Sequence, residues 1–261
     1  GTRVIQLDIN AANLGRHYPN EVSLMGDAKA TLNAMLSMCE PNPDFREPWV
    51  ARTQQFVDDW RAELSPLLHS DAKPIRPERI CQTLTEWLPD DAILVSDTGH
   101  SGMWTAGMID LTPGQSYLRA AGSLGWGLPA SIGAKLACPE RPVVLFSGDA
   151  GFWYHTTELE TAVRWNAPII AIVNNNSSTN QGISDEIEAR GGKLEGRHGD
   201  VWQFTPSNFA DIARSMGAEG LRVESPDELE GALDAALGMG KPVVVDVVTD
   251  QMAEAPTVWL G

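Results

Sequence analysis

The sequence predicts an α/β fold, a doubly wound parallel sheet with helices on both faces, and three observations support it. Short apolar runs, such as residues 142–146 and 168–173, have the composition of buried parallel strands. Segments with helical spacing separate these runs, so strand and helix patterns alternate along most of the chain. Polar residues and glycines follow directly after the apolar runs, where ligands bind in open sheets of this kind.

The expected elements begin with a strand at residues 3–8 and a helix at residues 27–38. A proline-rich linker at residues 40–44 and a charged helix at residues 49–64 follow, and Ser65-Pro66 is expected to break that helix. Thr157 and Glu160 have the spacing of a capping box, and Ser225-Pro226 is typical of a helix start. The other predicted helices span residues 77–88, 101–108, 128–137 and 206–216, and the other predicted strands span residues 92–96, 142–146, 168–173, 220–223 and 242–248.

The most informative motif joins Asp149, in a glycine-flanked turn, to Asn176, which lies 27 positions later and follows the next apolar run. Both residues are expected at the carboxyl ends of neighbouring strands. A carboxylate and an amide oxygen suit Mg2+, which takes few protein carboxylates and completes its octahedron with phosphate oxygens and water. The alternative is an ordinary turn followed by an asparagine-rich loop, because Asp, Asn, Ser and Gly dominate turns.

Composition limits the classes of partner. The formal net charge of −16 argues against nucleic acid and anionic membranes, so a bound diphosphate would need a metal ion, backbone N–H groups or helix N-termini. The sequence contains no apolar run of about 20 residues and no signal-peptide pattern at its start. Three widely spaced cysteines suit a reducing compartment, and we therefore expect a cytoplasmic protein.

The motif resembles that of thiamine-diphosphate-dependent enzymes, whose usual form is Gly-Asp-Gly, some two dozen residues, and Asn-Asn. Residues 118–137 are similar to the preceding segment of the acetolactate synthase-like group, and residues 4–10 with residues 26–30 resemble the end of that group's central domain. The resemblance covers most of the chain in order. One departure is Ala150, which stands where the motif usually has glycine and requires a negative φ.

The resemblance implies roles for individual residues. Mg2+ would be bound by Asp149, by the side chain of Asn176, with Asn175 as the alternative, and by the backbone carbonyl of Ser178. Asp97 is either a site residue or a helix cap, and His100 is either a donor to the diphosphate or an ordinary loop histidine. The residues expected to bind the cofactor are Thr98, Gly99, His100, Ser101, Gly122, Ser123, Leu124, Gly148, Asp149, Ala150, Gly151, Asn176, Ser178 and Thr179.

Two residues of a glycine-rich loop would act in catalysis. By resemblance, the carbonyl of Gly122 accepts a hydrogen bond from the aminopyrimidine, and Leu124 is the apolar wedge under the bent cofactor. The alternative for Leu124 is a plain core leucine. A nicotinamide-binding loop is disfavoured because the order of the glycines differs from Gly-x-Gly-x-x-Gly.

The resemblance also predicts the organisation of the chain. Residues 1–40 would be the end of a central α/β domain, residues 41–73 a linker with a helix, and residues 74–261 the domain that binds thiamine diphosphate and Mg2+. The catalytic Glu of the group belongs to a pyrimidine-binding domain in an N-terminal half. That half would be a separate chain or a missing part of this one. The complete enzyme would be a homo- or hetero-oligomer (dimer or tetramer). Some members also hold FAD in the central domain. Residues 179–198 would form a lid, with Gln181 and Trp259 facing substrate.

The implied function is Mg2+- and thiamine-diphosphate-dependent cleavage or formation of C–C bonds in 2-oxo acids or related carbonyl compounds, as a lyase or transferase. Two alternatives stay open. One is a 2-oxo acid or oxalyl-CoA-type decarboxylase of the same superfamily. The other is a non-catalytic assembly subunit that keeps the fold.

Overall fold

The computed structural model describes residues 1–193 and 196–256. The chain divides into two compact units, Gly1–Asp58 and Asp59–Gly261, and each is described by itself. The division into three regions, with boundaries after residues 40 and 73, stays a prediction.

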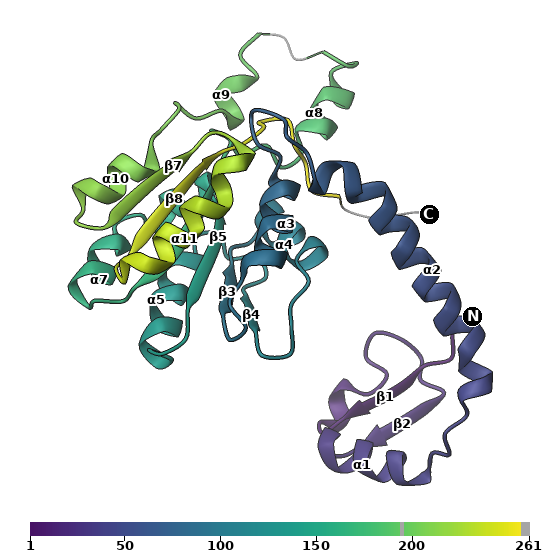
Figure 1. Cartoon of the computed structure of the whole chain (residues 1–261). Helices are drawn as coiled ribbons and strands as arrows, with labels where there is room; N and C mark the ends of the chain where they lie inside the picture. Colours follow the sequence, from purple (N-terminus) through teal and green to yellow (C-terminus); the bar gives the residue numbers. More distant parts are fainter. Residues whose placement is uncertain (194–195, 257–261) are drawn as a thin grey trace. The chain divides into compact units, whose positions relative to one another are not determined.

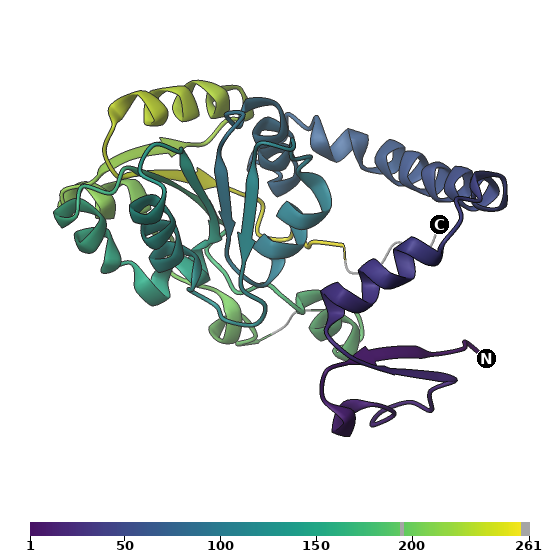
Figure 2. The same cartoon turned by 90° about the horizontal axis from the view of Figure 1, so that it is seen from below.

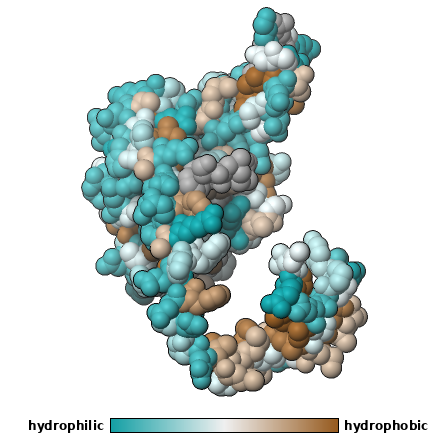
Figure 3. Space-filling view, turned by 90° about the vertical axis from the view of Figure 1, so that its right-hand side faces the viewer, coloured by the Kyte–Doolittle hydropathy of each residue, from teal (hydrophilic) through white to brown (hydrophobic). Residues whose placement is uncertain are grey.

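The first unit contains a small parallel sheet and a helix. Strand β1 (Ile5–Asp8) pairs with β2 (Val22–Met25) after a 3-10 turn, η1 (Ala11–Asn13), and helix α1 (Ala28–Met38) follows. Asp27 caps α1, because its Oδ1 accepts a hydrogen bond of 2.8 Å from the backbone N of Ala30. None of the described residues of this unit is buried, and apolar side chains are exposed along its elements, as the brown surface in Figure 3 shows.

Helix α2 (Pro43–Leu68) is longer than predicted. The expected linker at residues 40–44 gives way to the helix at Pro43, whose fixed φ suits a first turn. The prediction that Ser65-Pro66 would break the helix was wrong, because α2 continues to Leu68. Leu64 is buried in the core of the second unit and Leu67 and Leu68 pack against it, so apolar packing outweighs the hydrogen bond that Pro66 cannot donate.

The second unit contains a six-stranded sheet in the order β4-β3-β5-β6-β8-β7, in which every neighbouring pair is parallel. Figure 1 shows helices on both of its faces. The strands are β3 (Ile93–Ser96), β4 (Ser116–Arg119), β5 (Val143–Gly148), β6 (Ile169–Asn175), β7 (Glu219–Val223) and β8 (Val243–Val248). This arrangement confirms the predicted doubly wound α/β fold.

Side-chain alternation along the strands divides the core into two layers. Ile170 and Ile172 belong to the layer under α3 (Pro77–Trp87), α4 (His100–Met108) and α11 (Leu229–Met239). Ile169, Ala171 and Val173 belong to the layer under α5 (Gly127–Ala137), α7 (Glu158–Arg164) and α10 (Phe209–Ser215). The two sets of helices are seen on opposite sides of the sheet in Figure 2. β6 is therefore covered on both faces, as its continuous apolar run predicts.

Several helix starts differ from the predictions. The capping box at Thr157 does not form, since Thr157 has helical φ and ψ and makes no side-chain cap. The helix predicted over residues 206–216 begins only at Phe209, because the Asn208 side chain caps it. The predicted start at Ser225 is confirmed as a capping box with Glu228, which opens a 3-10 turn, η2 (Pro226–Glu228), before α11.

The region after Asn176 contains two short helices, α8 (Ile183–Ala189) and α9 (Gly199–Trp202). Within the described ranges, no helix is both long and apolar enough to cross a membrane.

The strand order fixes where a ligand can bind. From β3 the chain adds β4 on one side and β5 on the other, so the direction of winding changes between β3 and β5. In open α/β sheets, ligands bind beyond the carboxyl ends of the strands at such a switch point. The segments that leave β3, β5 and β6 at this edge are those of Asp97, Asp149 and Asn176.

Candidate functional site

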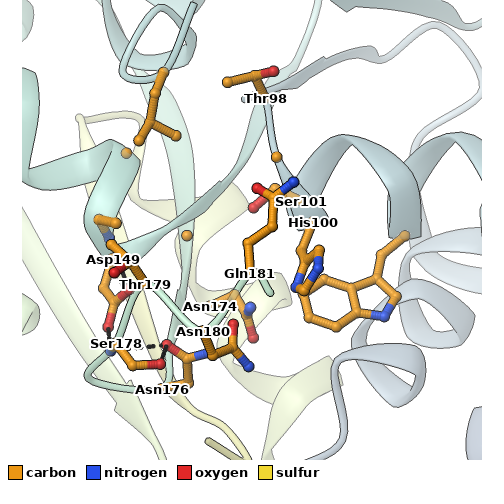
Figure 4. Close-up of a pocket in the computed structure, with 16 residues that line it drawn as sticks. Thr98, His100, Ser101, Asp149, Asn174, Asn176, Ser178, Thr179, Asn180 and Gln181 are labelled. Atoms are coloured by element: carbon orange, nitrogen blue, oxygen red, sulfur yellow. Dashed lines mark hydrogen bonds between the residues drawn. The ribbon is translucent and has the colours of Figure 1, made fainter. Parts of the chain in front are cut away.

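A pocket lies at this edge of the sheet (Figure 4). Its wall is built by the loop after β3, by the start of α6 (Asp149–His155) after β5, and by the segment after β6. The lining residues are Thr98, Gly99, His100, Ser101, Trp104, Leu124, Gly148, Asp149, Ala150, Gly151, Asn174, Asn176, Ser178, Thr179, Asn180 and Gln181. Of the fourteen residues predicted to bind the cofactor, Gly122 and Ser123 are not among them.

Asp149 occupies the first position of α6, where the sequence predicted a turn. Its side chain is buried, and its carboxylate accepts hydrogen bonds from the backbone N of Ala150 at 2.7 Å and of Ser178 at 3.1 Å. Burial nevertheless raises the pKa of the Asp149 carboxyl group to about 7. A cation bound beside this carboxylate would compensate for its lost hydration.

Asn176 and Ser178 complete the polar corner that Asp149 begins. Asn176 Oδ1 accepts hydrogen bonds from the backbone N of Ser178 at 3.0 Å and from its Oγ at 3.1 Å. Ser177, between them, has a φ of 54°, which is costly for a residue other than glycine. The turn therefore brings Asp149, Asn176 and Ser178 together at the pocket, as Figure 4 shows.

Asn175 faces away from this corner. Its Nδ2 donates to Asp246 Oδ1 at 2.8 Å and to the carbonyl of Ser207 at 2.9 Å. Asp246 is completely buried and also accepts from Arg222 Nη1 at 2.7 Å. Because successive side chains of a strand point to opposite faces, Asn175 serves the sheet interior while Asn176 lies on the pocket side.

The donor set fits a hard dication that brings further oxygen ligands with it. The corner offers one carboxylate, one amide oxygen and backbone carbonyls, and no cluster of three or more His, Cys, Asp or Glu in the described part of the chain could hold a metal. Mg2+ is bound in this way, through one or two carboxylates together with phosphate oxygens and water.

The loop after β3 offers a second anchor for an anion. Gly99 has a φ of 72°, and α4 begins at His100, so the positive end of the helix faces the pocket. Ser101 Oγ lies near Gly148, since a Cβ added to that glycine would stand 3.4 Å from it. Burial lowers the pKa of His100.

Asp97 does neither of the two things predicted for it. The N-cap position of α4 is occupied by Gly99 and not by Asp97, and no side chain caps the helix. Asp97 is also absent from the residues that line the pocket. Its buried carboxylate instead accepts hydrogen bonds from the backbone N of Thr98 at 2.7 Å and of Gly125 at 3.0 Å.

The glycine-rich loop lies next to the β3 loop. The backbone N of Gly122 donates to Thr98 Oγ1 at 3.1 Å, and Gly122 has a φ of 82°. Leu124 lines the pocket and is 37% exposed, so the alternative of a plain core leucine is wrong. The roles of Gly122 as an acceptor and Leu124 as a wedge stay predictions.

The departure at Ala150 is accommodated. Ala150 lies in α6 and is not among the residues with positive φ, so a Cβ causes no strain there. Gly151 has no such freedom, because an added Cβ would stand 2.9 Å from Asp97 Oδ2.

Trp104 and Asn174 line the pocket but were not predicted, whereas Asn180 belongs to the predicted lid segment and Gln181 was predicted to face substrate. Alternation along β6 offered a signal for Asn174, since a residue two positions before Asn176 lies on the same face. Trp104 lies one turn after His100 in α4, so helical spacing offered a signal for it as well. Trp259, the other residue predicted to face substrate, is outside the described residues.

Fold and site together define an α/β domain with a polar pocket at a topological switch point, where open sheets of this kind bind ligands. The family described as thiamine pyrophosphate enzyme, C-terminal TPP binding domain, matches residues 97–247. The chain belongs to this family.

Curated relatives agree with this assignment. The chain is 30% identical over 249 residues to the thiamine pyrophosphate-containing protein YdaP of Bacillus subtilis, covering 95% of this chain and 42% of the relative. It is 27% identical over 260 residues to the acetolactate synthase isozyme 3 large subunit of Escherichia coli (95% and 43%). It is 28% identical over 256 residues to the mitochondrial acetolactate synthase catalytic subunit of Saccharomyces cerevisiae (95% and 36%). The chain thus spans less than half the length of these relatives and resembles the C-terminal half of an acetolactate synthase-like enzyme.

Proposed function

We propose that this chain binds thiamine diphosphate through Mg2+ in an enzyme that cleaves or forms C–C bonds of 2-oxo acids or related carbonyl compounds. The observation that carries the proposal is the corner of Asp149, Asn176 and Ser178, which offers hard oxygen ligands beside the start of α4. Relatives named acetolactate synthase favour this chemistry over decarboxylation of 2-oxo acids or oxalyl-CoA.

The chain's own residues would hold and orient the cofactor. Asp149, Asn176 and the carbonyl of Ser178 would bind Mg2+, and backbone N–H groups at the start of α4 and α6 would bind the diphosphate. Leu124 would support the bent cofactor from the glycine-rich loop. Thiamine diphosphate supplies, when bound, the electron sink that this chemistry requires.

The complete enzyme would need more chain than the 261 residues here. The relatives are more than twice as long, and the exposed apolar side chains of the unit Gly1–Asp58 would be covered by further parts of a central domain. A pyrimidine-binding domain with the catalytic Glu would complete the site in an oligomer. FAD in the central domain remains compatible with this proposal.

We also propose a cytoplasmic location, since Cys39, Cys81 and Cys138 are all free. A non-catalytic assembly subunit is disfavoured by the retained pair of Asp149 and Asn176, because such a subunit does not need metal ligands.

The test is the variant Asp149→Ala. Removal of the carboxylate should abolish Mg2+-dependent binding of thiamine diphosphate, measured by isothermal titration calorimetry, while the circular dichroism spectrum stays that of the wild type. Asp110→Ala is a suitable control, since Asp110 does not line the pocket and forms an exposed ion pair with Arg61. Unchanged cofactor affinity in Asp149→Ala would overturn the metal assignment.

A further inference from the structure

β6 ends with Asn174 and Asn175, and Asn176 follows directly, which makes one asparagine more than the motif Asn-Asn requires. Asn175 points to the interior and binds Asp246, whereas Asn174 and Asn176 both line the pocket. The hydrogen bond to Asp246 therefore explains Asn175, and the corner with Asp149 and Ser178 explains Asn176. Asn174 is left without a role.

The side chain of Asn174 lies in an unusual environment. The residue is only 3% exposed, and its Oδ1 has no hydrogen-bond partner among the described residues. A buried polar atom without a partner costs about 1–3 kcal/mol. The two apolar residues before it on this face, Ile170 and Ile172, show what the core accepts at such positions. A leucine at position 174 would continue their layer at no such cost.

The position of Asn174 relates it to the metal corner. It is in register with Gly148, the residue directly before Asp149, across the β5–β6 pair. Figure 4 shows its side chain in the group that includes Asn176 and Asn180. His100 Nδ1, on the same pocket, is a second buried atom without a partner in the described chain. Trp104 Nε1, of another lining residue, is a third. Three residues that line one cavity thus each carry a buried polar atom without a partner among the described residues, which indicates that a ligand supplies partners there.

We propose that Asn174 is a further binding residue of this site, whose Oδ1 accepts a hydrogen bond from a water molecule held by the Mg2+–diphosphate headgroup. The inference rests on the proposed function. Mg2+ releases its water reluctantly and usually keeps several molecules when bound. A water held by the metal needs acceptors, and Asn174 Oδ1 is a buried acceptor that nothing in the described protein uses.

Asn174 should affect the stability of the ligand-free and the ligand-bound protein in opposite ways. Without ligand, the unpartnered carboxamide destabilises the fold, and with ligand it gains its hydrogen bond. A residue that merely supports the sheet would behave differently, since its replacement would destabilise the protein both with and without ligand.

The decisive variant is Asn174→Leu, which keeps approximate size and removes the polar group. The melting temperature of the ligand-free chain should rise, because the unpartnered group is gone. The affinity for thiamine diphosphate with Mg2+, and for inorganic pyrophosphate with Mg2+, should fall by up to about tenfold, as expected for loss of one hydrogen bond between neutral groups. Both quantities are measured on the full chain, by scanning calorimetry and isothermal titration calorimetry.

Two further variants sharpen the result. Asn180→Leu is the matched contrast, because Asn180 Nδ2 donates to the carbonyls of Gln251 and Ala253, and its loss should lower the melting temperature. Asn174→Asp keeps the acceptor oxygen and should retain or tighten Mg2+-dependent binding. A loss in Asn174→Asp as large as that in Asn174→Leu would show that the amide donates to the diphosphate, and would overturn the water contact.

The outcomes separate this inference from the proposed function. A lower melting temperature in Asn174→Leu, or an affinity equal to that of the wild type, would overturn the role of Asn174 while the loss of binding in Asp149→Ala still supported the cofactor. If the wild-type chain bound neither Mg2+ probe, both the proposed function and the role of Asn174 would be wrong.

Discussion

Asp97 Oδ1 and the backbone N of Gly125 are joined by a hydrogen bond of 3.0 Å, although 28 residues separate them. Asp97 follows β3, whereas Gly125 belongs to the glycine-rich loop that presents Leu124. Ser147 Oγ, at the end of β5, also donates to the Asp97 carboxylate at 3.2 Å. One buried carboxylate therefore ties together the three segments that carry the phosphate loop, the glycine-rich loop and Asp149.

Replacement of Asp97 by alanine should loosen these three segments at once. Buried N–H and O–H groups lose a charged acceptor, so the free energy of unfolding should fall by about 2–3 kcal/mol. Cofactor affinity should fall as well, because the glycine-rich loop loses its anchor at Gly125. Urea denaturation measures the first effect and titration calorimetry the second.

Asp91→Ala is the matched control for Asp97→Ala. Asp91 is exposed and precedes the same strand at its other end, so its replacement should change the free energy of unfolding by less than about 0.5 kcal/mol. Equal effects of the two substitutions would contradict the anchoring role of Asp97.

The sequence predicted the central strands well, because strands that are buried on both faces consist of continuous apolar runs. The runs at residues 142–146 and 168–173 became β5 and β6, with every residue of β6 buried. β4 was not predicted as a strand. It contains Ser116 and Arg119, lies at the edge of the sheet and is only partly buried, so it carries no continuous apolar signal.

The site was predictable where a residue type limits the chemistry. Asp149 and Asn176 could be recognised because few side chains offer hard oxygen ligands at the ends of strands. The role of Asp97 could not be predicted, since its partners at Gly125 and Gly127 are backbone N–H groups that every residue but proline possesses. Tertiary folding alone brings these donors to one carboxylate.

Asp246 should stabilise the metal corner through its hydrogen bond with Asn175. The carboxylate accepts from Asn175 Nδ2, from Arg222 Nη1 and from the backbone N of Phe209 at 2.9 Å. In Asp246→Asn the charge is lost and an amide N–H faces these donors, so the free energy of unfolding should fall by about 2–3 kcal/mol. Urea denaturation checks this value, and Mg2+ titration should show weaker binding because Asn175 no longer fixes the turn at Asn176.

Glu224→Gln is the control for this network. Glu224 binds the same guanidinium of Arg222 at 2.7 Å but is 65% exposed, so its loss should cost less than about 1 kcal/mol. If Glu224→Gln weakened Mg2+ binding as much as Asp246→Asn does, the effect would belong to Arg222 and not to the contact between Asp246 and Asn175.

The buried histidine of the pocket should make the ligand-free fold sensitive to mild acid. Burial lowers the pKa of His100 below its ordinary value of 6.5, while the charge of Glu254 and a hydrogen bond that the His100 ring donates to Asn180 act against this shift. The unfolded chain therefore binds a proton at this position more readily than the folded one, and the contribution of His100 to stability should fall as the pH drops below about 6.5. Asp149, whose pKa burial raises to about 7, contributes with the opposite sign in this range.

In His100→Asn this part of the acid sensitivity should disappear. The free energy of unfolding is measured with urea between pH 7.5 and pH 5.5, about the range in which an ordinary histidine titrates. At the acid end of this range, relative to pH 7.5, it should be higher in His100→Asn than in the wild type. His17→Asn, at an exposed position, should leave the slope unchanged. The contributions of other titrating groups are common to the three proteins, so the difference in slope isolates His100. A slope as steep in His100→Asn as in the wild type would show that His100 takes up its proton equally well in the folded and unfolded chain, and that burial in the pocket does not disfavour its charged form.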